Sequence, residues 1–234
     1  MMDKHRYEIK FVVNDIKLAE FYAWLWTRTA MHEAYPERII NSLYFDDVKF
    51  RSVRDNIAGL PAREKFRMRW YSFPGNKNNL EVQGIKLEKK VREGRLGYKE
   101  SISLAHLKDQ LLSRDIGYLK SSSMEQFVKL GLIESNLGYE IFPALHVNYK
   151  RKYFEDMDNI RITIDSDINF YHVSDLARLF EHSPLGWSKK VIEFKFDPVH
   201  KNKVAELIRP LHMVPQRCSK YLQGMAYNNM VMYL

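Results

Sequence analysis

The chain has 234 residues, of which 45% are hydrophobic, so it can fill a substantial core, and this composition argues against intrinsic disorder. Lysine and arginine outnumber aspartate and glutamate by 37 to 29, and the resulting formal charge of +8 favours an anionic partner. The single cysteine, Cys218, excludes an internal disulfide framework and a cysteine zinc cluster. We find no apolar run long enough for a membrane span and no signal-peptide pattern, so we expect a soluble, cytoplasmic protein.

The first hundred residues contain mostly strand patterns. Asn14 can cap a helix over about 15–31, where apolar residues recur near a 3.6-residue period. A polar, glycine-containing stretch at 72–79 predicts a loop. Strands are expected at 6–13, 41–46, 64–73, 84–94 and 95–101.

The remainder of the chain mixes helix and strand patterns. Helices are expected over 103–137, 173–182, 202–212 and 219–233. Strands are expected over 143–155, 159–171 and 189–197. Because strands outnumber helices without alternating strictly with them, the predicted class is α+β with a closed or strongly curved antiparallel sheet. We expect one domain that spans residues 1–234.

Charged side chains recur at every second position of several predicted strands. In "EKFRMRWYSF" (64–73), Lys65, Arg67 and Arg69 alternate with apolar residues. Other strands place charged or polar residues two apart in the same way: Arg6, Glu8 and Lys10; Lys86, Glu88 and Lys90; Tyr149 and Arg151; Arg161, Thr163 and Asp165; Glu193 and Lys195. Alternate side chains of a strand point to opposite faces, so each strand has one charged face and one apolar face.

A single strand of this kind is typical of a half-exposed sheet with its charges in water. The recurrence of faces rich in lysine and arginine instead favours an antiparallel β-barrel tunnel with a charged lumen and helices packed outside. Such a lumen suits a chain of phosphates, since arginine binds phosphate oxygens in bidentate fashion and lysine supplies point charges. Glu8, Glu88 and Glu193 then fit as ligands of Mg²⁺ or Mn²⁺, or as structural partners of the cations.

The motifs "RYEIK", "LYFD", "KFRMRWY", "LEKKVREGRLGYKES", "NYKRKYF", "IRITID", "VIEFKF" and "RCSKYLQG" resemble, in order and spacing, those of the VTC domain. That family comprises the catalytic domain of the vacuolar transporter chaperone polyphosphate polymerase and bacterial stand-alone versions. It belongs to the triphosphate tunnel metalloenzymes, which are related to the CYTH group. The resemblance covers nearly the whole chain and implies an antiparallel barrel whose charged strand faces point inward.

The resemblance implies roles for individual residues. Those implied at the catalytic centre, on the phosphate chain, are Arg67, Arg69, Lys90, Arg151, Arg161 and Lys220. Those implied as further substrate contacts are Arg6, Lys10, Lys65, Lys99, Lys195 and Ser219. Glu193 resembles the divalent-metal carboxylate of the family, and Glu88 and Glu8 are additional candidates. The first strand has one acid, Glu8, where CYTH hydrolases carry a paired-acid ExExK pattern, and this departure favours a polymerase over thiamine-triphosphatase or adenylate-cyclase chemistry.

The expected reaction is metal-dependent transfer of the γ-phosphate of ATP to a polyphosphate chain, and the expected partners are therefore ATP and polyphosphate. Hydrolysis of triphosphate or short polyphosphate is a second enzymatic interpretation, and a non-catalytic polyphosphate-binding module is a third. Nucleic-acid binding is disfavoured, because the aromatic residues alternate with the cations and face away from them. His146 is expected in the core, Cys218 as a buried residue at a helix start, and Tyr44 and Asp46 in structural roles.

Overall fold

One antiparallel sheet dominates the computed structural model, which describes residues 6–72, 82–93, 96–104, 108, 125–128, 141–173 and 183–231. Its strands are β1 (Tyr7–Val13), β2 (His32–Asp46), β3 (Ala62–Ser72), β4 (Gln83–Glu93), β5 (Leu96–Ser103), β6 (Phe142–Glu155), β7 (Arg161–His172), β8 (Leu185–Trp187) and β9 (Lys190–Phe196). Their order is β1-β9-β7-β6-β2-β3-β4-β5, and β8 pairs with β7. The helices are α1 (Asp15–Arg28), α2 (Arg51–Ile57), α5 (Lys201–Ile208) and α6 (Lys220–Tyr227).

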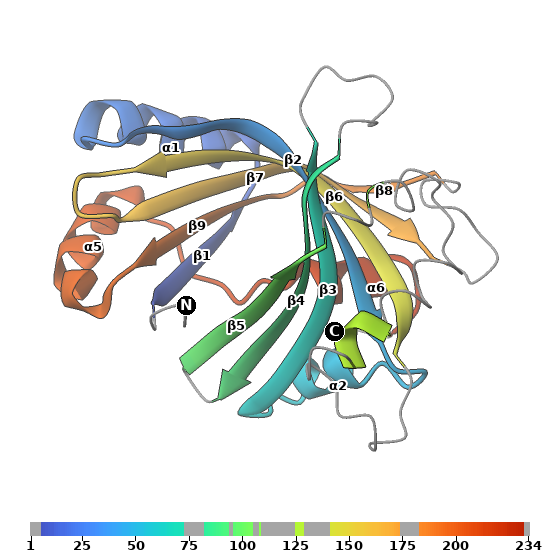
Figure 1. Ribbon diagram of the computed structural model, residues 1–234. Helices are drawn as coiled ribbons and strands as arrows, with labels where there is room; N and C mark the ends of the chain where they lie inside the picture. Colours follow the sequence, from blue (N-terminus) through green and yellow to red (C-terminus); the bar gives the residue numbers. More distant parts are fainter. Residues whose placement is uncertain are drawn as a thin grey trace.

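The sheet curls strongly, so that its two ends approach each other (Figure 1). Among the described residues, no strand pairing joins β1 to β5, and the path of hydrogen-bonded strands is therefore open. An ion pair of 3.6 Å between Lys90 Nζ on β4 and Glu8 Oε2 on β1 spans this seam. The predicted class, α+β with a strongly curved antiparallel sheet, is confirmed, although strand hydrogen bonds do not close the barrel.

The alternation of charged and apolar residues places the charges on the concave side of the sheet, which we call the inner face. On β3, Phe66 and Met68 pack in a convex core cluster with Phe127, whereas Arg67 and Arg69 point to the other side. On the convex side of β9, Phe194 meets Phe21 of α1 edge to face, with ring centroids 6.2 Å apart. Helices α1 and α5 therefore cover one half of the convex face with apolar side chains.

Helix α1 begins as the sequence predicts, because the side chain of Asn14 accepts a hydrogen bond of 2.9 Å from the backbone nitrogen of Lys17. It ends at Arg28 rather than at residue 31, since Thr29 adopts extended backbone angles. The buried residues Phe21, Trp24 and Leu25 lie on the face that packs on the sheet. Burial of each such side chain contributes about 1.5–3 kcal/mol to folding.

Strand β2 is longer than expected, because it begins at His32 instead of at residue 41. Pro36 and the polar residues around it weaken the strand pattern of this segment, since proline cannot donate a hydrogen bond to a neighbouring strand. The pairing of β2 with β6 accommodates the segment through register shifts between Glu33 and Tyr35 and between Tyr35 and Arg38. The irregular pairing brings Arg38 opposite Arg151.

Helix α6 differs from the expectation that the helices pack outside the barrel, because it packs on the inner face. Its residues Tyr221, Leu222 and Met225 join a core cluster with residues of β6 and β7, including Leu145 and Phe170. The Tyr221 hydroxyl donates a hydrogen bond of 2.7 Å to Asp46 Oδ2 on β2. One part of the inner face is apolar, and the apolar side chains of α6 bury it.

Other elements depart from the sequence predictions in smaller ways. Helix α2 and strand β8 were not predicted. Between residues 103 and 137 the sequence predicts a helix; β5 continues to Ser103, and the described residues of that range are helical at 108 and 125–128 and not at 104. The rest of that range, the expected helix over 173–182 except its first residue, and most of the expected loop at 72–79 lie outside the described residues. Among the described residues, no helix combines the length and apolar character needed to cross a membrane.

Gly224 allows α6 to approach the sheet, and Gly224→Ala is expected to lower the free energy of unfolding by about 1–3 kcal/mol. A Cβ at this position would lie 2.5 Å from Leu145 Cδ2 and 2.7 Å from Phe170 Cδ1, so the helix would have to shift. Urea unfolding of the variant and the wild type measures the difference. Gly186→Ala is the matched control, because its nearest neighbour would be Asn169 Oδ1 at 3.6 Å, and an equal loss in both variants would contradict the prediction.

Candidate functional site

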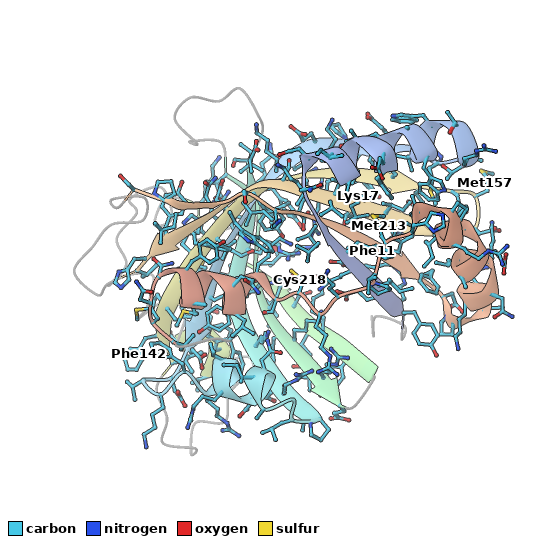
Figure 2. All side chains as sticks on the ribbon, turned by 180° about the vertical axis from the view of Figure 1, so that it is seen from behind. Phe11, Lys17, Phe142, Met157, Met213 and Cys218 are labelled. Atoms are coloured by element: carbon cyan, nitrogen blue, oxygen red, sulfur yellow. The ribbon has the colours of Figure 1, made fainter. Side chains whose placement is uncertain are left out.

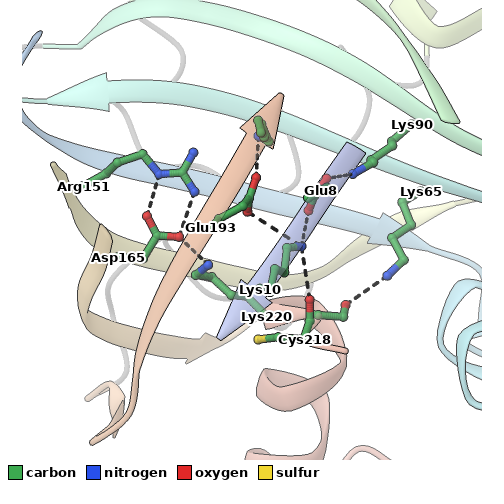
Figure 3. A network of polar contacts seen from close by, with 11 residues as sticks. Glu8, Lys10, Lys65, Lys90, Arg151, Asp165, Glu193, Cys218 and Lys220 are labelled. Atoms are coloured by element: carbon green, nitrogen blue, oxygen red, sulfur yellow. Dashed lines mark hydrogen bonds and ion pairs between the residues drawn. The ribbon is translucent and has the colours of Figure 1, made fainter. Parts of the chain in front are cut away.

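Basic residues from strands far apart in the chain meet on the inner face, where carboxylates pair with them (Figure 3). Three almost fully buried carboxylates form ion pairs there: Glu88 on β4, Asp165 on β7 and Glu193 on β9. A buried carboxylate requires compensating cations, because loss of water disfavours its charged form. Each of these acids contacts at least two basic side chains, so the inner face carries an excess of positive charge.

The first group of contacts surrounds Glu88. Arg67 Nε donates a hydrogen bond of 2.5 Å to Glu88 Oε2, and Lys99 Nζ donates one of 3.3 Å to Oε1. Arg69 Nε lies 3.9 Å from the same carboxylate. Burial would raise the pKa of Glu88, but Arg67, Arg69 and Lys99 outweigh burial and hold the pKa far below its usual range. Glu88 therefore remains an anion that holds Arg67 by a hydrogen bond and attracts Arg69, two residues further along β3.

The second group surrounds Asp165. Arg151 binds this carboxylate through Nε and Nη2, at 2.5 and 2.7 Å, and Lys220 Nζ donates a further hydrogen bond of 2.5 Å. Tyr149 packs against both cations, with its ring centroid 5.3 Å from Arg151 Cζ and 4.7 Å from Lys220 Nζ. Burial would raise the pKa of Asp165, but the two cations lower it. Asp165 therefore orients one cation from the sheet and one from the start of α6.

The third group joins β1, β9 and β4. Lys10 Nζ lies 2.5 Å from Glu8 Oε1 and 3.7 Å from Glu193 Oε2, so one ammonium group connects two carboxylates. Lys195 pairs with Glu193 at 2.5 Å, and Lys90 pairs with Glu8 at 3.6 Å. Partial burial and the charge of Glu193 would raise the pKa of Glu8, but Lys10, Lys90 and Lys195 lower it to about 2.

Lys65 is the least compensated lysine of the group. Its Nζ donates a hydrogen bond of 2.9 Å to Ser219 Oγ, and none of the carboxylates in the described residues forms an ion pair with it. Burial, together with repulsion by Lys90, Lys10 and Arg63, lowers its pKa to about 7. This lysine is therefore partly neutral near neutral pH until an anion approaches.

The segment that leads into α6 connects the two sides of the open seam. The backbone nitrogen of Gln216 donates a hydrogen bond of 2.8 Å to the Lys10 carbonyl on β1, and Lys10 Nζ contacts the Cys218 carbonyl at 3.3 Å. On the other side, Ser219 accepts the hydrogen bond from Lys65 on β3 and caps the Leu222 nitrogen at 3.3 Å. Figure 2 shows Cys218 between the β1 side and the β3–β5 side of the sheet.

Two of the sequence-selected cations lie at the edge of this arrangement. Arg161 is half-exposed and its Nε lies 3.0 Å from Glu155 Oε1, at a register position opposite Lys195. Arg6 precedes β1 and is exposed. The other selected residues fall within the three groups or beside Lys65, so the structure brings most of the set together.

Four buried side-chain atoms on the inner face lack a hydrogen-bond partner among the described residues. They are Arg38 Nε, Ser42 Oγ, Arg69 Nε and Thr163 Oγ1. The strand register places Ser42 opposite Arg69, Thr163 opposite Glu193 and Arg38 opposite Arg151. Unpaired buried polar atoms are costly, and water, an ion or a polar ligand on this face would supply the missing partners.

Glu8 and Glu193 are the carboxylates that fit a divalent cation. They lie on adjacent strands and repel each other. The ammonium group of Lys10 contacts both carboxylates, so a positive charge already lies where a metal ion could bind. Two carboxylates completed by phosphate oxygens form a usual Mg²⁺ site. Glu88 belongs to a separate group and is committed to Arg67, Arg69 and Lys99. Among the described residues, no group of three or more potential ligand side chains could hold a metal ion.

The sequence did not identify Asp165 or Arg38 as a catalytic, substrate-binding or metal-binding residue. The alternation with Arg161 and Thr163 already placed Asp165 on the charged face, but its two cationic partners come from β6 and α6. Arg38 lay outside the strand predicted at 41–46. A strand extended backwards with the same period of two would have included it.

Of the remaining polar candidates, His146 lies apart from the cations, whereas Tyr44 lies opposite Arg67 and Cys218 lies beside Lys10. His146 is buried between Trp70 and Tyr171, with ring centroids 5.4 and 5.1 Å away, and burial lowers its pKa to about 3. Burial raises the pKa of the Cys218 thiol, which disfavours a thiolate. Tyr44 stacks on Tyr221 with ring centroids 4.8 Å apart, so it helps to anchor α6.

Two solved structures share this fold over nearly their whole length. The PH1819 protein from Pyrococcus horikoshii OT3 is 16% identical, with 93% of this chain and 97% of that chain covered and a TM-score of 0.52. A putative adenylyl cyclase, HpAC1 from Hippeastrum, is 12% identical, with 98% and 97% covered and a TM-score of 0.52. A search of curated proteins found no significant match. The family described as the VTC domain matches residues 5–229, and with its curled antiparallel sheet and basic inner face this chain belongs to the VTC-domain family.

Proposed function

We propose that the inner face binds a chain of phosphates and transfers the γ-phosphate of ATP to the end of that chain. The observation that carries this proposal is the convergence of Arg67, Arg69, Arg151 and Lys220, whose charge exceeds that of the buried carboxylates beside them. An anion with many oxygens in a row can pair with all of these cations. Each charge-assisted hydrogen bond contributes about 1.5–3 kcal/mol.

The carboxylates prepare the cations for such a ligand. Asp165 and Glu88 hold the guanidinium groups of Arg151 and Arg67 in fixed positions, so little side-chain entropy remains to be lost when phosphate binds. Phosphate oxygens would then accept hydrogen bonds from the donors that the carboxylates leave free. Arg69 Nε is one of these donors, since it has no hydrogen-bond partner among the described residues. The site is therefore preorganised for the charge of a transferring phosphoryl group.

The reaction requires no strong general base. A terminal phosphate oxygen of the polymer is already anionic, so it can attack the γ-phosphorus while the bond to the β–γ bridging oxygen breaks and ADP leaves. Arginines 67, 69 and 151 would stabilise the charge on the phosphoryl oxygens, and Lys220 would orient the chain from the start of α6. Glu8 and Glu193 would hold a Mn²⁺ or Mg²⁺ ion, which supplies charge neutralisation at the phosphates when bound.

Hydrolysis of triphosphate or short polyphosphate is a second candidate function. The Hippeastrum protein that shares the fold is described as having a dominant triphosphatase activity, which favours a substrate of the same chemical class. The same cations would bind triphosphate, and water would replace the polymer as the attacking group. Binding without turnover is the third interpretation of the site.

Incubation of the purified protein with ATP and Mn²⁺ is expected to produce long polyphosphate that gel electrophoresis resolves. Arg67→Gln is expected to reduce the rate about 100-fold or more, because it removes a donor aimed at the phosphoryl group. Lys17→Gln is the charge-matched control, since Lys17 lies exposed on α1 and pairs with Glu20. Phosphate release from tripolyphosphate without polymer synthesis would instead support the hydrolase, and binding without either product would support the non-catalytic module.

Lys65 is expected to make tripolyphosphate affinity fall as the pH rises above 7. Its pKa is about 7 in the free protein, and a bound polyanion favours the ammonium form, so binding above that pH takes up a proton. Affinity then declines by up to about tenfold per pH unit. Calorimetry at pH 6 to 9 measures this profile, and Lys65→Arg should flatten it because arginine stays charged. The titration of the phosphate itself is common to both proteins, so identical profiles would contradict the role of Lys65.

Glu193→Gln is expected to raise the Mn²⁺ concentration needed for half-maximal rate by about tenfold or more, because it removes one of two paired carboxylates. Tripolyphosphate binding in the absence of metal should not weaken, since the variant has one negative charge fewer beside the ligand. Glu206→Gln, on the exposed side of α5, is the control. An unchanged metal requirement in Glu193→Gln would exclude this carboxylate as a ligand.

A further inference from the structure

Arg38 lies at the end of the row of cations on the inner face. Its position on β2 is opposite Arg151 on β6, and its guanidinium lies over three tyrosine rings. The distances from Arg38 Cζ to the ring centroids are 5.2 Å for Tyr35, 5.6 Å for Tyr71 and 5.8 Å for Tyr153. Tyr71 is two residues beyond Arg69 on the same face of β3, so Arg38 continues the row formed by Lys65, Arg67 and Arg69. Each step of two residues along a strand covers about 6–7 Å.

No carboxylate in the described part of the chain compensates the charge of Arg38. None of the described residues forms an ion pair with Arg38, whereas Arg67 and Arg151 each bind a buried carboxylate. Its Nε is buried and has no hydrogen-bond partner among the described residues. Glu37, its neighbour in the chain, lies close enough to Lys150 for its charge to add to the effect of Asp167 in raising the pKa of that lysine.

The tyrosines position the guanidinium but do not neutralise it. Tyr35 and Tyr153 meet edge to face with ring centroids 5.7 Å apart, which limits the movement of both rings. Burial raises the pKa of Tyr153 to about 12, so this phenol remains uncharged. The face of an aromatic ring attracts a cation but offers its N–H groups no lone pair, so these donors still require an acceptor.

We propose that Arg38, with Tyr35, Tyr71 and Tyr153 around it, forms an additional phosphate-binding subsite beyond Arg69 and Arg151. The inference rests on the proposed function and extends it to chain length. A triphosphate bound to Arg67, Arg69 and Arg151 does not need this position, whereas a longer polyphosphate continues to it. The subsite favours an anion over a neutral ring, because the uncompensated charge and unpaired Nε of Arg38 both require an acceptor. The protein therefore binds long polyphosphate more tightly than tripolyphosphate.

Calorimetry without ATP or metal tests the subsite with two probes, inorganic tripolyphosphate and a long inorganic polyphosphate of defined length. Arg38→Gln is expected to weaken binding of the long chain about 10- to 100-fold, which corresponds to one charge-assisted contact. Tripolyphosphate binding should change by no more than about twofold. Lys150→Gln is the matched control, since it removes one charge from the adjacent position of β6 on the convex side, and it should change neither affinity.

The outcomes separate the subsite from the proposed function. Wild-type protein that binds neither probe would overturn the proposed function, and with it the basis of the subsite. Equal losses for both probes in Arg38→Gln, or no loss for either, would overturn the subsite alone. A separate titration with ATP completes the test, because weakened ATP binding with unchanged polyphosphate binding would overturn the subsite and assign Arg38 to the nucleotide. If circular dichroism shows that Arg38→Gln does not fold, Arg38→Lys replaces it in the same two titrations. Lysine keeps the charge but lacks the planar set of guanidinium N–H donors, so binding of the long chain should still weaken more than binding of tripolyphosphate.

Discussion

Repulsion among converging cations is the constraint on which the structure depends. The curl of the sheet brings basic side chains of β1, β3, β4, β6 and α6 together, and such an arrangement is unstable unless anions separate the charges. Three buried carboxylates, Glu88, Asp165 and Glu193, provide these anions within the chain. Buried ion pairs contribute little net stability, because loss of water offsets their attraction. Their main consequence here is therefore the fixed placement of donors for an external polyanion.

The same contacts couple the site to the architecture. Residues 216–220 touch β1 through Lys10, β3 through Lys65 and β7 through Asp165. This segment leads directly into α6, whose apolar residues cover the rest of the inner face. A phosphate chain that pairs with Lys10, Lys65 and Lys220 would therefore connect both sides of the open seam, and ligand binding should stabilise the curled sheet as well as occupy the site.

The difference between Lys65 and its neighbours shows how position sets the behaviour of chemically similar residues. Lys10 has two carboxylate partners, which keep its pKa raised despite burial, whereas Lys65 faces other cations and a serine hydroxyl. Arg38 is a third case, in which aromatic rings replace carboxylates. Paired cations such as Lys10, the lysine with a lowered pKa, Lys65, and Arg38 among its aromatic rings should therefore each respond differently to a phosphate.

The sequence by itself determined which side chains share a face, because the period of two in a strand is a local property of the backbone. It also predicted the Asn14 cap and, through the motifs of the VTC domain, the residues that converge. Only the tertiary structure decided that Asp165 lies between Arg151 and Lys220, that α6 covers the inner face and that Arg38 joins the row of cations. These features depend on the register between distant strands and on the irregular pairing around Pro36, and both arise from packing between segments far apart in the chain.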